Sequence, residues 1–273
     1  MDLLVIGHVT RDEVDGGLRL GGAASYAALA AARLGYETAL VTVAPPDDPL
    51  LEPLRRAPRL NVHCVASDVM TTFALDYAGA QRRLWLRRRA RPLVIGDVPA
   101  AWLRAPVAYV GPVAGECDGP FVRALRARFA GAGVQGWLRR TDQDGRVEPL
   151  PLAEAPEVRE PPPLNVAVLS EEDHPAAGEV AQSFVAAGAT VAITRGARGA
   201  TLWAQKERID VPAAPAREVE ATGAGDVFGV VLTLELAAGR SMLAAGRAAA
   251  SAAARVVEGA GLGTLPQSAP RPF

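Results

Sequence analysis

The chain has 273 residues, of which 49% are hydrophobic and 22% charged, a composition that excludes a largely disordered protein and supplies a sizeable core. Its 29 basic and 30 acidic side chains give a formal net charge of −1, so no overall positive field holds a polyanion, and we expect no nucleic-acid partner. Lys206 is the only lysine, which excludes a P-loop nucleotide site, because that loop binds phosphate through a lysine.

The cysteines and histidines form no metal or disulfide pattern. Cys64 and Cys117 lack a CxxC spacing, and the three histidines are scattered along the chain. The N-terminus has no basic region before its short apolar run, and Arg247 and Arg255 interrupt the alanine-rich stretches before they reach membrane-spanning length. We therefore expect a soluble cytoplasmic protein with no membrane partner.

Five short apolar runs are typical of strands that are covered on both faces of a parallel sheet. They are residues 3–6, 38–43, 107–110, 166–169 and 190–193. Helix patterns lie between several of them, at residues 22–34, 120–129 and 175–187; the second places Phe121, Leu125 and Phe129 on one face. This alternation predicts an α/β layered fold with a mainly parallel sheet.

Two segments depart from the alternation. Residues 71–91 alternate in polarity through Phe73 and Leu75, pass an Ala78-Gly79 turn and alternate again, which predicts an antiparallel hairpin with one dry and one wet face. With a strand at about residues 13–20, this hairpin is expected to form a small lid sheet. Residues 148–163 are so rich in proline that we expect a surface connection. Neither flank changes in composition, which favours one domain over residues 1–273.

The last third of the chain predicts two helices. One begins within ATGAGDVFGVVLTLELAAG and ends at Gly239, and the other runs from Ser241, as N-cap, to about Val257.

The sequence ATGAGDVF, residues 221–228, carries the clearest chemical signal. Small residues at Gly223, Ala224 and Gly225 allow backbone N–H groups to converge on an anion at the positive end of the following helix. Asp226 lies in the first turn, where a carboxylate can deprotonate a hydroxyl that attacks phosphorus. The alternative is that the glycines only turn the chain and that Asp226 caps the helix.

ATGAGDVF resembles the DTTGAGDxF signature of the ribokinase-like (PfkB) carbohydrate kinases. Three further motifs are similar to those of the family and occur in its order: GHVTRD at residues 7–12, the glycine pair Gly21-Gly22, and ITRGARG at residues 193–199. The resemblance implies a three-layer α/β/α fold with a small β lid. It also implies an ATP-dependent kinase that uses Mg²⁺ and acts on a polyol. A homodimer through the lid is expected on the same ground.

The resemblance also implies roles for individual residues. Asp226 would be the general base, and the amides of Gly223, Ala224 and Gly225 would stabilise the transferred phosphoryl group. The substrate would be bound by Asp12, Gly21, Gly22, Tyr26 and Arg139. Arg139 is included because VQGWLRR stands in the place of the family's DPNLR strand. The nucleotide would lie against Thr194, Gly196, Gly199 and Thr222, and Asp173 would support the metal indirectly.

Some positions depart from the family pattern. Glu220 and Ala221 replace the leading aspartate and threonine of the signature, and Ser170 and Asp173 stand where NxxE is usual. Tyr26 replaces an asparagine, which argues against ribose, whereas GGAAS before an aromatic residue and PVAGE at residues 112–116 are similar to the inositol kinase branch.

These departures leave two rival functions open. One is a nucleoside kinase in which Tyr26 stacks on a base; the other is a ligand-binding or regulatory protein that has lost catalysis. The arginines of residues 82–91 are interpreted as a solvated lid strand in preference to an anion site. His8 is either a substrate contact or a hydrogen-bonded packing residue.

Overall fold

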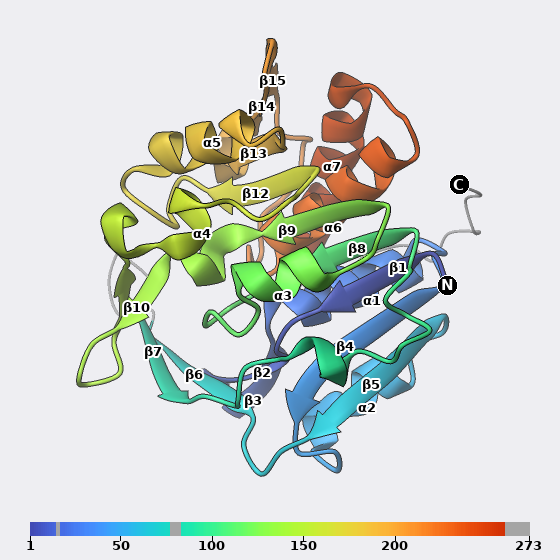
Figure 1. Cartoon of the computed structure of the whole chain (residues 1–273), viewed down its shortest axis with the longest axis vertical. Coiled ribbons are helices and arrows are strands. Elements are labelled where there is room, and N and C mark those ends of the chain that lie inside the picture. The colour runs from blue at the N-terminus through green and yellow to red at the C-terminus, as the bar shows by residue number, and fades with distance from the viewer. Residues whose placement is uncertain (15–16, 77–82, 260–273) are drawn as a thin grey trace.

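A computed structural model describes residues 1–14, 17–76 and 83–259 (Figure 1). Its centre is a nine-stranded sheet in the order β15-β14-β13-β12-β9-β8-β1-β4-β5. The strands from β13 to β5 are parallel to their neighbours, and β14 and β15 are antiparallel. The strand bounds are β1 Leu3–Ile6, β4 Thr38–Ala44, β5 Leu60–Ala66, β8 Val107–Val110, β9 Phe129–Gly133, β12 Val166–Ser170, β13 Thr190–Thr194, β14 Ala200–Ala204 and β15 Glu207–Val211.

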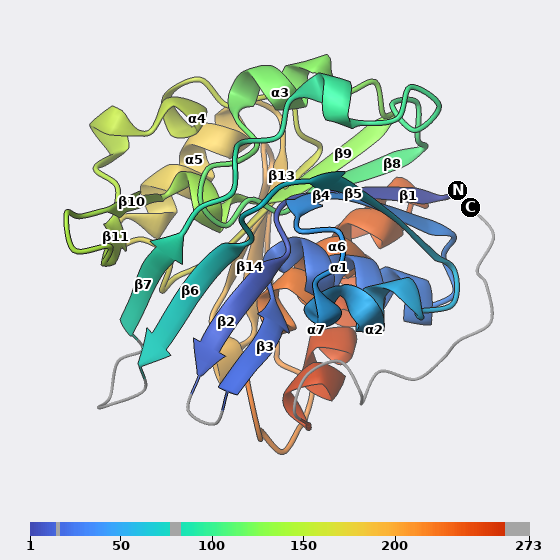
Figure 2. The same cartoon turned by 90° about the horizontal axis from the view of Figure 1, so that it is seen from below.

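Helices cover both faces of this sheet, because its central strands are apolar on both sides. In β1, Leu3 and Val5 pack into one core, while Leu4 and Ile6 pack into the other. The first core is covered by α1 Ala23–Arg33, α2 Glu52–Arg55, α6 Ala224–Ala237 and α7 Met242–Val257; the second is covered by α3 Gly119–Ala124, α4 Pro156–Arg159 and α5 Ala177–Ala186 (Figure 2). The expected three-layer fold is confirmed.

A second, four-stranded sheet in the order β3-β2-β6-β7 projects from the main body (Figure 2). Its strands are β2 Thr10–Val14, β3 Gly17–Gly21, β6 Thr71–Asp76 and β7 Arg83–Arg88. The predicted antiparallel pairing of residues 71–91 is present as β6 and β7, although the Ala78-Gly79 turn lies outside the described residues. In place of one strand at residues 13–20, the chain forms the β2–β3 hairpin, in which β2 also pairs with β6.

Two further predictions differ from the structure. The helix expected at residues 120–129 ends at Ala124, because Leu125 is extended and the N–H of Arg126 donates to the Leu103 carbonyl (3.2 Å); Phe129 instead begins β9. The segment 148–163 contains the end of β11 and the short helix α4, whose Val158 is buried. The remaining short elements are β10 Arg139–Thr141, β11 Val147–Pro149 and the 3-10 turns η1 Pro49–Leu51, η2 Ile95–Asp97, η3 Val134–Trp137, η4 Leu152–Glu154 and η5 Gly196–Arg198.

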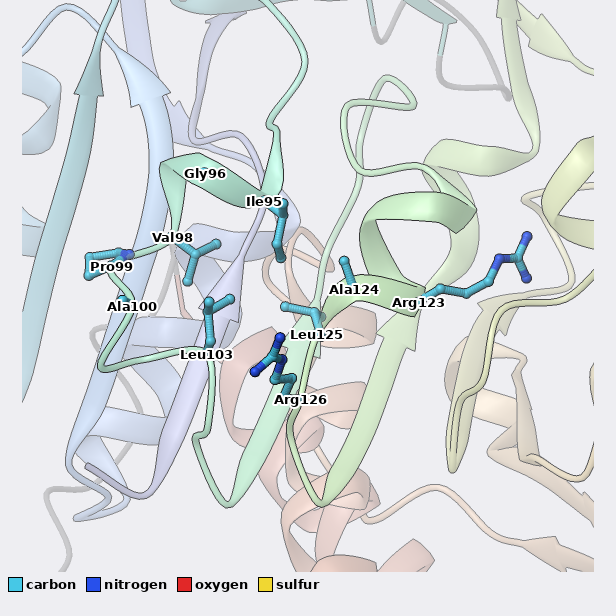
Figure 3. Close-up of a pocket in the computed structure, with 10 residues that line it drawn as sticks. All are labelled: Ile95, Gly96, Val98, Pro99, Ala100, Leu103, Arg123, Ala124, Leu125 and Arg126. Carbon is cyan, nitrogen blue, oxygen red and sulfur yellow. The ribbon is translucent and has the colours of Figure 1, made fainter.

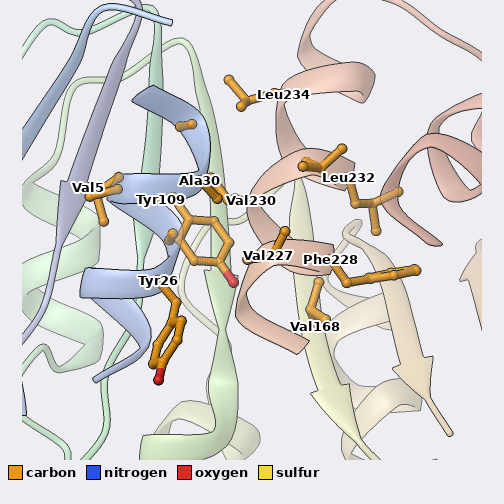
Figure 4. Packing of buried hydrophobic residues seen from close by; sticks show 14 of the residues in the cluster. Val5, Tyr26, Ala30, Tyr109, Val168, Val227, Phe228, Val230, Leu232 and Leu234 are labelled. Atoms are coloured by element: carbon orange, nitrogen blue, oxygen red, sulfur yellow. The ribbon is translucent and has the colours of Figure 1, made fainter. Parts of the chain in front are cut away.

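Glycines in α6 and in the sheet allow the two to pack closely against each other. A Cβ at Gly229 of α6 would lie 2.2 Å from the Tyr109 hydroxyl oxygen, and one at Gly131 of β9 would lie 2.2 Å from Thr233 Oγ1. Figure 4 shows Tyr109 reaching from β8 to this helix. The helix ends before Gly239, which has φ 77°, and Ser241 caps α7 by accepting a hydrogen bond from the N–H of Ala244 (3.3 Å), as the sequence predicts.

Candidate active site

The candidate site is built around the N-terminus of α6. Gly223, the N-cap, has φ 84°, and a Cβ there would lie 2.1 Å from Tyr26 Cδ1. Only glycine satisfies both the left-handed conformation and this contact with the ring of Tyr26. Asp226 lies in the first turn of the helix and is partly exposed, as the sequence predicts.

The backbone amides before this helix are available to different extents. Within the described residues, no hydrogen bond occupies the N–H groups of Gly223 and Gly225. The N–H of Ala224 instead donates to the Ala221 carbonyl at 3.2 Å. Two of the three predicted amides are therefore open to an anion at the positive end of the helix dipole.

Asp12 and the glycine pair lie together where the lid joins α1. Asp12 is 5% exposed, and its Oδ1 accepts a hydrogen bond from the Thr10 hydroxyl (2.7 Å). A Cβ at Gly21 would lie 2.2 Å from Asp12 Oδ2, and Gly22 has φ 94° with its Cα close to the His8 carbonyl. Gly21 therefore brings the backbone directly against the Asp12 carboxylate.

Charged residues of the lid and of the N-terminus of α6 both act on the phenol of Tyr26. Tyr26 is buried at 6% exposure, and burial is the main cause that raises the pKa of its phenol to about 12. Arg19 opposes this rise, whereas Asp12, Asp226 and Glu220 add to it. Charged groups from the first and last parts of the sequence therefore act on one phenol.

An ion pair between Arg19 and Glu220 joins lid strand β3 to the segment before α6. Sequence motifs do not indicate it, because the two residues are 201 positions apart. Pairing of β2 with β3 places Arg19 opposite Asp12, so a prediction of that pairing would have placed Arg19 near the candidate site. That pairing was not predicted from the sequence.

The residues of the predicted nucleotide loop lie at the carboxyl end of β13. Thr194 ends the strand and donates to the Leu169 carbonyl (3.4 Å). Gly196 has φ 53° and Gly199 φ 80°; a Cβ at Gly199 would lie 2.1 Å from the Val211 carbonyl oxygen. Thr222, the other residue predicted to contact nucleotide, is partly exposed directly before Gly223.

Two other predicted site residues are held by local contacts. Arg139 donates to Gln135 Oε1 (2.9 Å) and to the Val113 carbonyl (3.4 Å), next to the PVAGE segment. Asp173 accepts from the N–H of Ser170 (2.7 Å), which fixes a turn at the end of β12. His8 is fully buried and hydrogen-bonded, so the packing interpretation of that residue is the one the structure supports.

The described residues contain no group of three or more His, Cys, Asp or Glu side chains that could hold a metal ion. Asp173, at the end of β12, is the carboxylate that the sequence predicts to support a metal through water. A single carboxylate fits Mg²⁺, because in phosphate-handling sites this ion keeps several waters and is bound by one or two carboxylates and the phosphates. Among the same residues, no helix is both long and apolar enough to cross a bilayer.

A surface pocket of about 680 Å³ lies elsewhere, between residues 95–103 and α3 (Figure 3). It is mostly apolar and includes Arg123 and Arg126, but none of the predicted site residues. The pocket is therefore separate from the chemistry described above.

Comparisons with known proteins agree with this architecture. Residues 165–269 match the family model described as pfkB family carbohydrate kinase. A search of curated proteins found no match.

Solved structures of three similar proteins share the fold. The chain is similar to a pyrophosphate-dependent kinase of the ribokinase family, solved with a pyrophosphate analog and myo-inositol (19% identity, 98% of this chain and 96% of that chain, TM-score 0.76). It is also similar to a sugar kinase from Pyrococcus horikoshii (18% identity, 97% of this chain and 94% of that chain, TM-score 0.74). A third similar protein is a fructokinase from Vibrio cholerae O395 with fructose, ADP and potassium ion bound (18% identity, 97% of this chain and 96% of that chain, TM-score 0.73).

At these identities the structures show the fold, and the match over residues 165–269 covers the segment that contains Asp226. The chain therefore has the ribokinase-like fold, and its residues 165–269 resemble the pfkB family of carbohydrate kinases.

Proposed function

We propose that this protein transfers a phosphoryl group to a hydroxyl of a cyclitol or sugar, with a myo-inositol-like polyol as the substrate class. The observation that carries the proposal is that Asp12 and Asp226 both act electrostatically on the phenol of Tyr26, whose ring lies directly against Gly223. Neutral polyols are recognised by carboxylates and close backbone approach, and both are supplied by Asp12 and Gly21. The pyrophosphate-dependent relative solved with myo-inositol supports the cyclitol class.

In the proposed reaction, Asp226 removes the proton from the substrate hydroxyl as its oxygen attacks phosphorus. A new O–P bond forms while the bond from phosphorus to the bridging oxygen of the donor breaks, and the leaving group departs with that oxygen's electron pair. The amides of Gly223 and Gly225 stabilise charge on the non-bridging oxygens. Bound with the donor, Mg²⁺ would neutralise phosphate charge, with Asp173 as its indirect support.

The donor proposed first is ATP. Thr194, Gly196 and Gly199 form a tight loop at the carboxyl end of β13, the kind of edge where ligands bind in open α/β sheets. Pyrophosphate is the second candidate, because it is the donor of a relative that matches 98% of the chain. Both donors present terminal phosphate to the same amides.

Turnover assays with purified full-length protein test substrate and donor together. Each of myo-inositol, fructose, ribose and adenosine is combined with Mg²⁺ and with either ATP or pyrophosphate, and phosphorylated product is detected by ³¹P NMR. The proposal expects the highest kcat/KM for the cyclitol.

The rival functions predict other results in the same assay. Preference for adenosine would favour a nucleoside kinase with Tyr26 against the base. Polyol-induced thermal stabilisation without any product would favour a ligand-binding protein that has lost catalysis.

A further inference from the structure

Arg19 shares the inner face of the lid with the predicted substrate aspartate. Asp12 of β2 pairs directly with Arg19 of β3 and, on its other side, with Phe73 of β6. Residues directly opposite in an antiparallel pair point to the same face, with Cβ atoms about 5 Å apart. Since Asp12 and Phe73 are buried on that face, Arg19 projects toward the body of the protein and not into open solvent.

The guanidinium of Arg19 meets the body at the segment that leads into the predicted anion site. Its partner, Glu220, lies three residues before Gly223, whose amide begins that site. The Arg19 side chain is 31% exposed and that of Glu220 is 23% exposed, so the ion pair lies at the border between the protein and solvent.

The charges around Tyr26 create a need for a cation at this place. Asp12, Asp226 and Glu220 all act on the phenol as negative charges, and Arg19 acts on it as a positive charge. A donor with several negative charges is repelled by three carboxylates unless a cation compensates them. Arginine meets this need well, because its planar fork binds two phosphate oxygens at once.

Other cations near the loops are already committed or distant in the fold. Lys206 is exposed in the turn between β14 and β15. Arg195 pairs with Asp210, and Arg198 pairs with Glu171. These pairs hold the loop at the end of β13, whereas Arg19 pairs with Glu220 before α6 and acts on the same phenol as Asp226.

We propose that Arg19 is a catalytic residue that binds the non-bridging oxygens of the transferred phosphoryl group, and that Glu220 holds its guanidinium in position. The inference rests on the proposed phosphoryl transfer. Arg19 forms no covalent bond and gives up no proton in the reaction: it donates hydrogen bonds and supplies positive charge while Asp226 accepts the hydroxyl proton. Because Arg19 belongs to the lid, its charge reaches the phosphate with the lid in place over the substrate.

The test compares Arg19→Met with Glu220→Gln, Arg19→Lys and Arg88→Met in the full chain. Arg88→Met removes an exposed lid arginine and is the matched control, expected to keep wild-type kinetics. For Arg19→Met we expect kcat/KM for the donor to fall by about 100-fold or more, with weaker binding of pyrophosphate in calorimetry. Glu220→Gln keeps an acceptor for Arg19 and is expected to lose about tenfold or less, while Arg19→Lys recovers only part of the activity.

Two outcomes separate this inference from the function on which it rests. Equal losses of kcat/KM in Arg19→Met and Glu220→Gln, with unchanged pyrophosphate affinity, would show that the pair only fastens the lid and would overturn the inference. If the wild-type protein transfers no phosphoryl group, the proposed function fails, and pyrophosphate binding alone decides whether Arg19 is an anion ligand. Addition of guanidinium to Arg19→Ala is a further check, because partial recovery of kcat is expected only when the missing group acts on the phosphate.

Discussion

Tyr109 carries a hydroxyl into the centre of the molecule, between Gly133 of β9 and Gly229 of α6 (Figure 4). The residue is fully buried, and no described residue makes a hydrogen bond with the hydroxyl. Burial raises the pKa of the phenol well above its usual value, and the charge of Asp226 raises it further. Two glycines therefore accommodate a polar atom close to the helix that carries the predicted base.

This packing predicts a coupling between Tyr109 and Gly229. Tyr109→Phe removes a buried hydroxyl without a described partner, so the free energy of unfolding is expected to stay equal or rise by about 1 kcal/mol. Gly229→Ala should lower it by about 1–3 kcal/mol, because the new Cβ would lie 2.2 Å from the hydroxyl oxygen. The alanine should cost less in the Tyr109→Phe background, where the nearest ring atom, Cζ, lies 3.1 Å away.

Urea unfolding of the two single variants and the double variant measures this coupling. Gly178→Ala is the control: it lies in α5 with no atom within 4 Å of its Cβ position, so the substitution should stabilise by up to about 1 kcal/mol. A large loss of stability in Tyr109→Phe would contradict the prediction and indicate a hydrogen bond to ordered water.

His8 is a second buried polar residue, at the junction of lid and body. Its Nε2 donates to the Arg91 carbonyl (3.0 Å), so Nδ1 accepts from the Thr71 hydroxyl (2.8 Å). The Glu116 carboxylate accepts the His8 N–H (2.9 Å) together with two N–H groups of the PVAGE segment. Hydrogen bonds of His8 therefore connect the end of β1 to the start of β6 and to the segment that follows β7.

The state of His8 predicts a pH dependence of stability. Burial lowers the pKa of the imidazole in the folded protein, despite the opposing effect of Glu116. Below about pH 6.5 the unfolded chain therefore takes up the proton first, and the free energy of unfolding falls with falling pH. His8→Gln should be less stable at pH 8 but should lose less stability between pH 7.5 and 5.5, measured by urea unfolding. Parallel losses in both proteins would contradict this assignment.

Among the elements, α6 and the lid carry most of the proposed site, and they were predictable to different extents. The apolar run and the terminal Gly239 predicted α6, and the glycines before Asp226 predicted its N-terminus. The antiparallel pairing of β2 with β3 was missed because residues 13–20 were treated as one strand.

The helix expected at residues 120–129 shows why local pattern has limits. Phe121, Leu125 and Phe129 have helical spacing, but hydrogen bonding of Arg126 to Leu103 redirects the chain, and Phe129 enters the sheet. Tertiary contacts therefore override a short periodic pattern, whereas α7, with sixteen residues and a serine cap, follows its sequence closely.

At the scale of the whole molecule, the sequence predicted the layers of the fold better than the connections within the site. The motifs predicted a set of site residues, and that set stays a prediction. They did not indicate that Tyr26 packs on Gly223 or that Arg19 reaches Glu220, since both contacts join the first and last parts of the chain. The homodimer through the lid stays a prediction, as does ATP as donor.

Phosphoryl transfer by Asp226→Asn tests the proposed general base most directly. The amide keeps the shape of the carboxylate but cannot accept the hydroxyl proton, so kcat should fall by about 1,000-fold or more while polyol and donor binding, measured by calorimetry, stay within a few-fold of wild type. Asp144→Asn, an exposed aspartate in the turn between β10 and β11, is the control and should retain full activity. Retention of most of the wild-type kcat in Asp226→Asn would contradict the assignment.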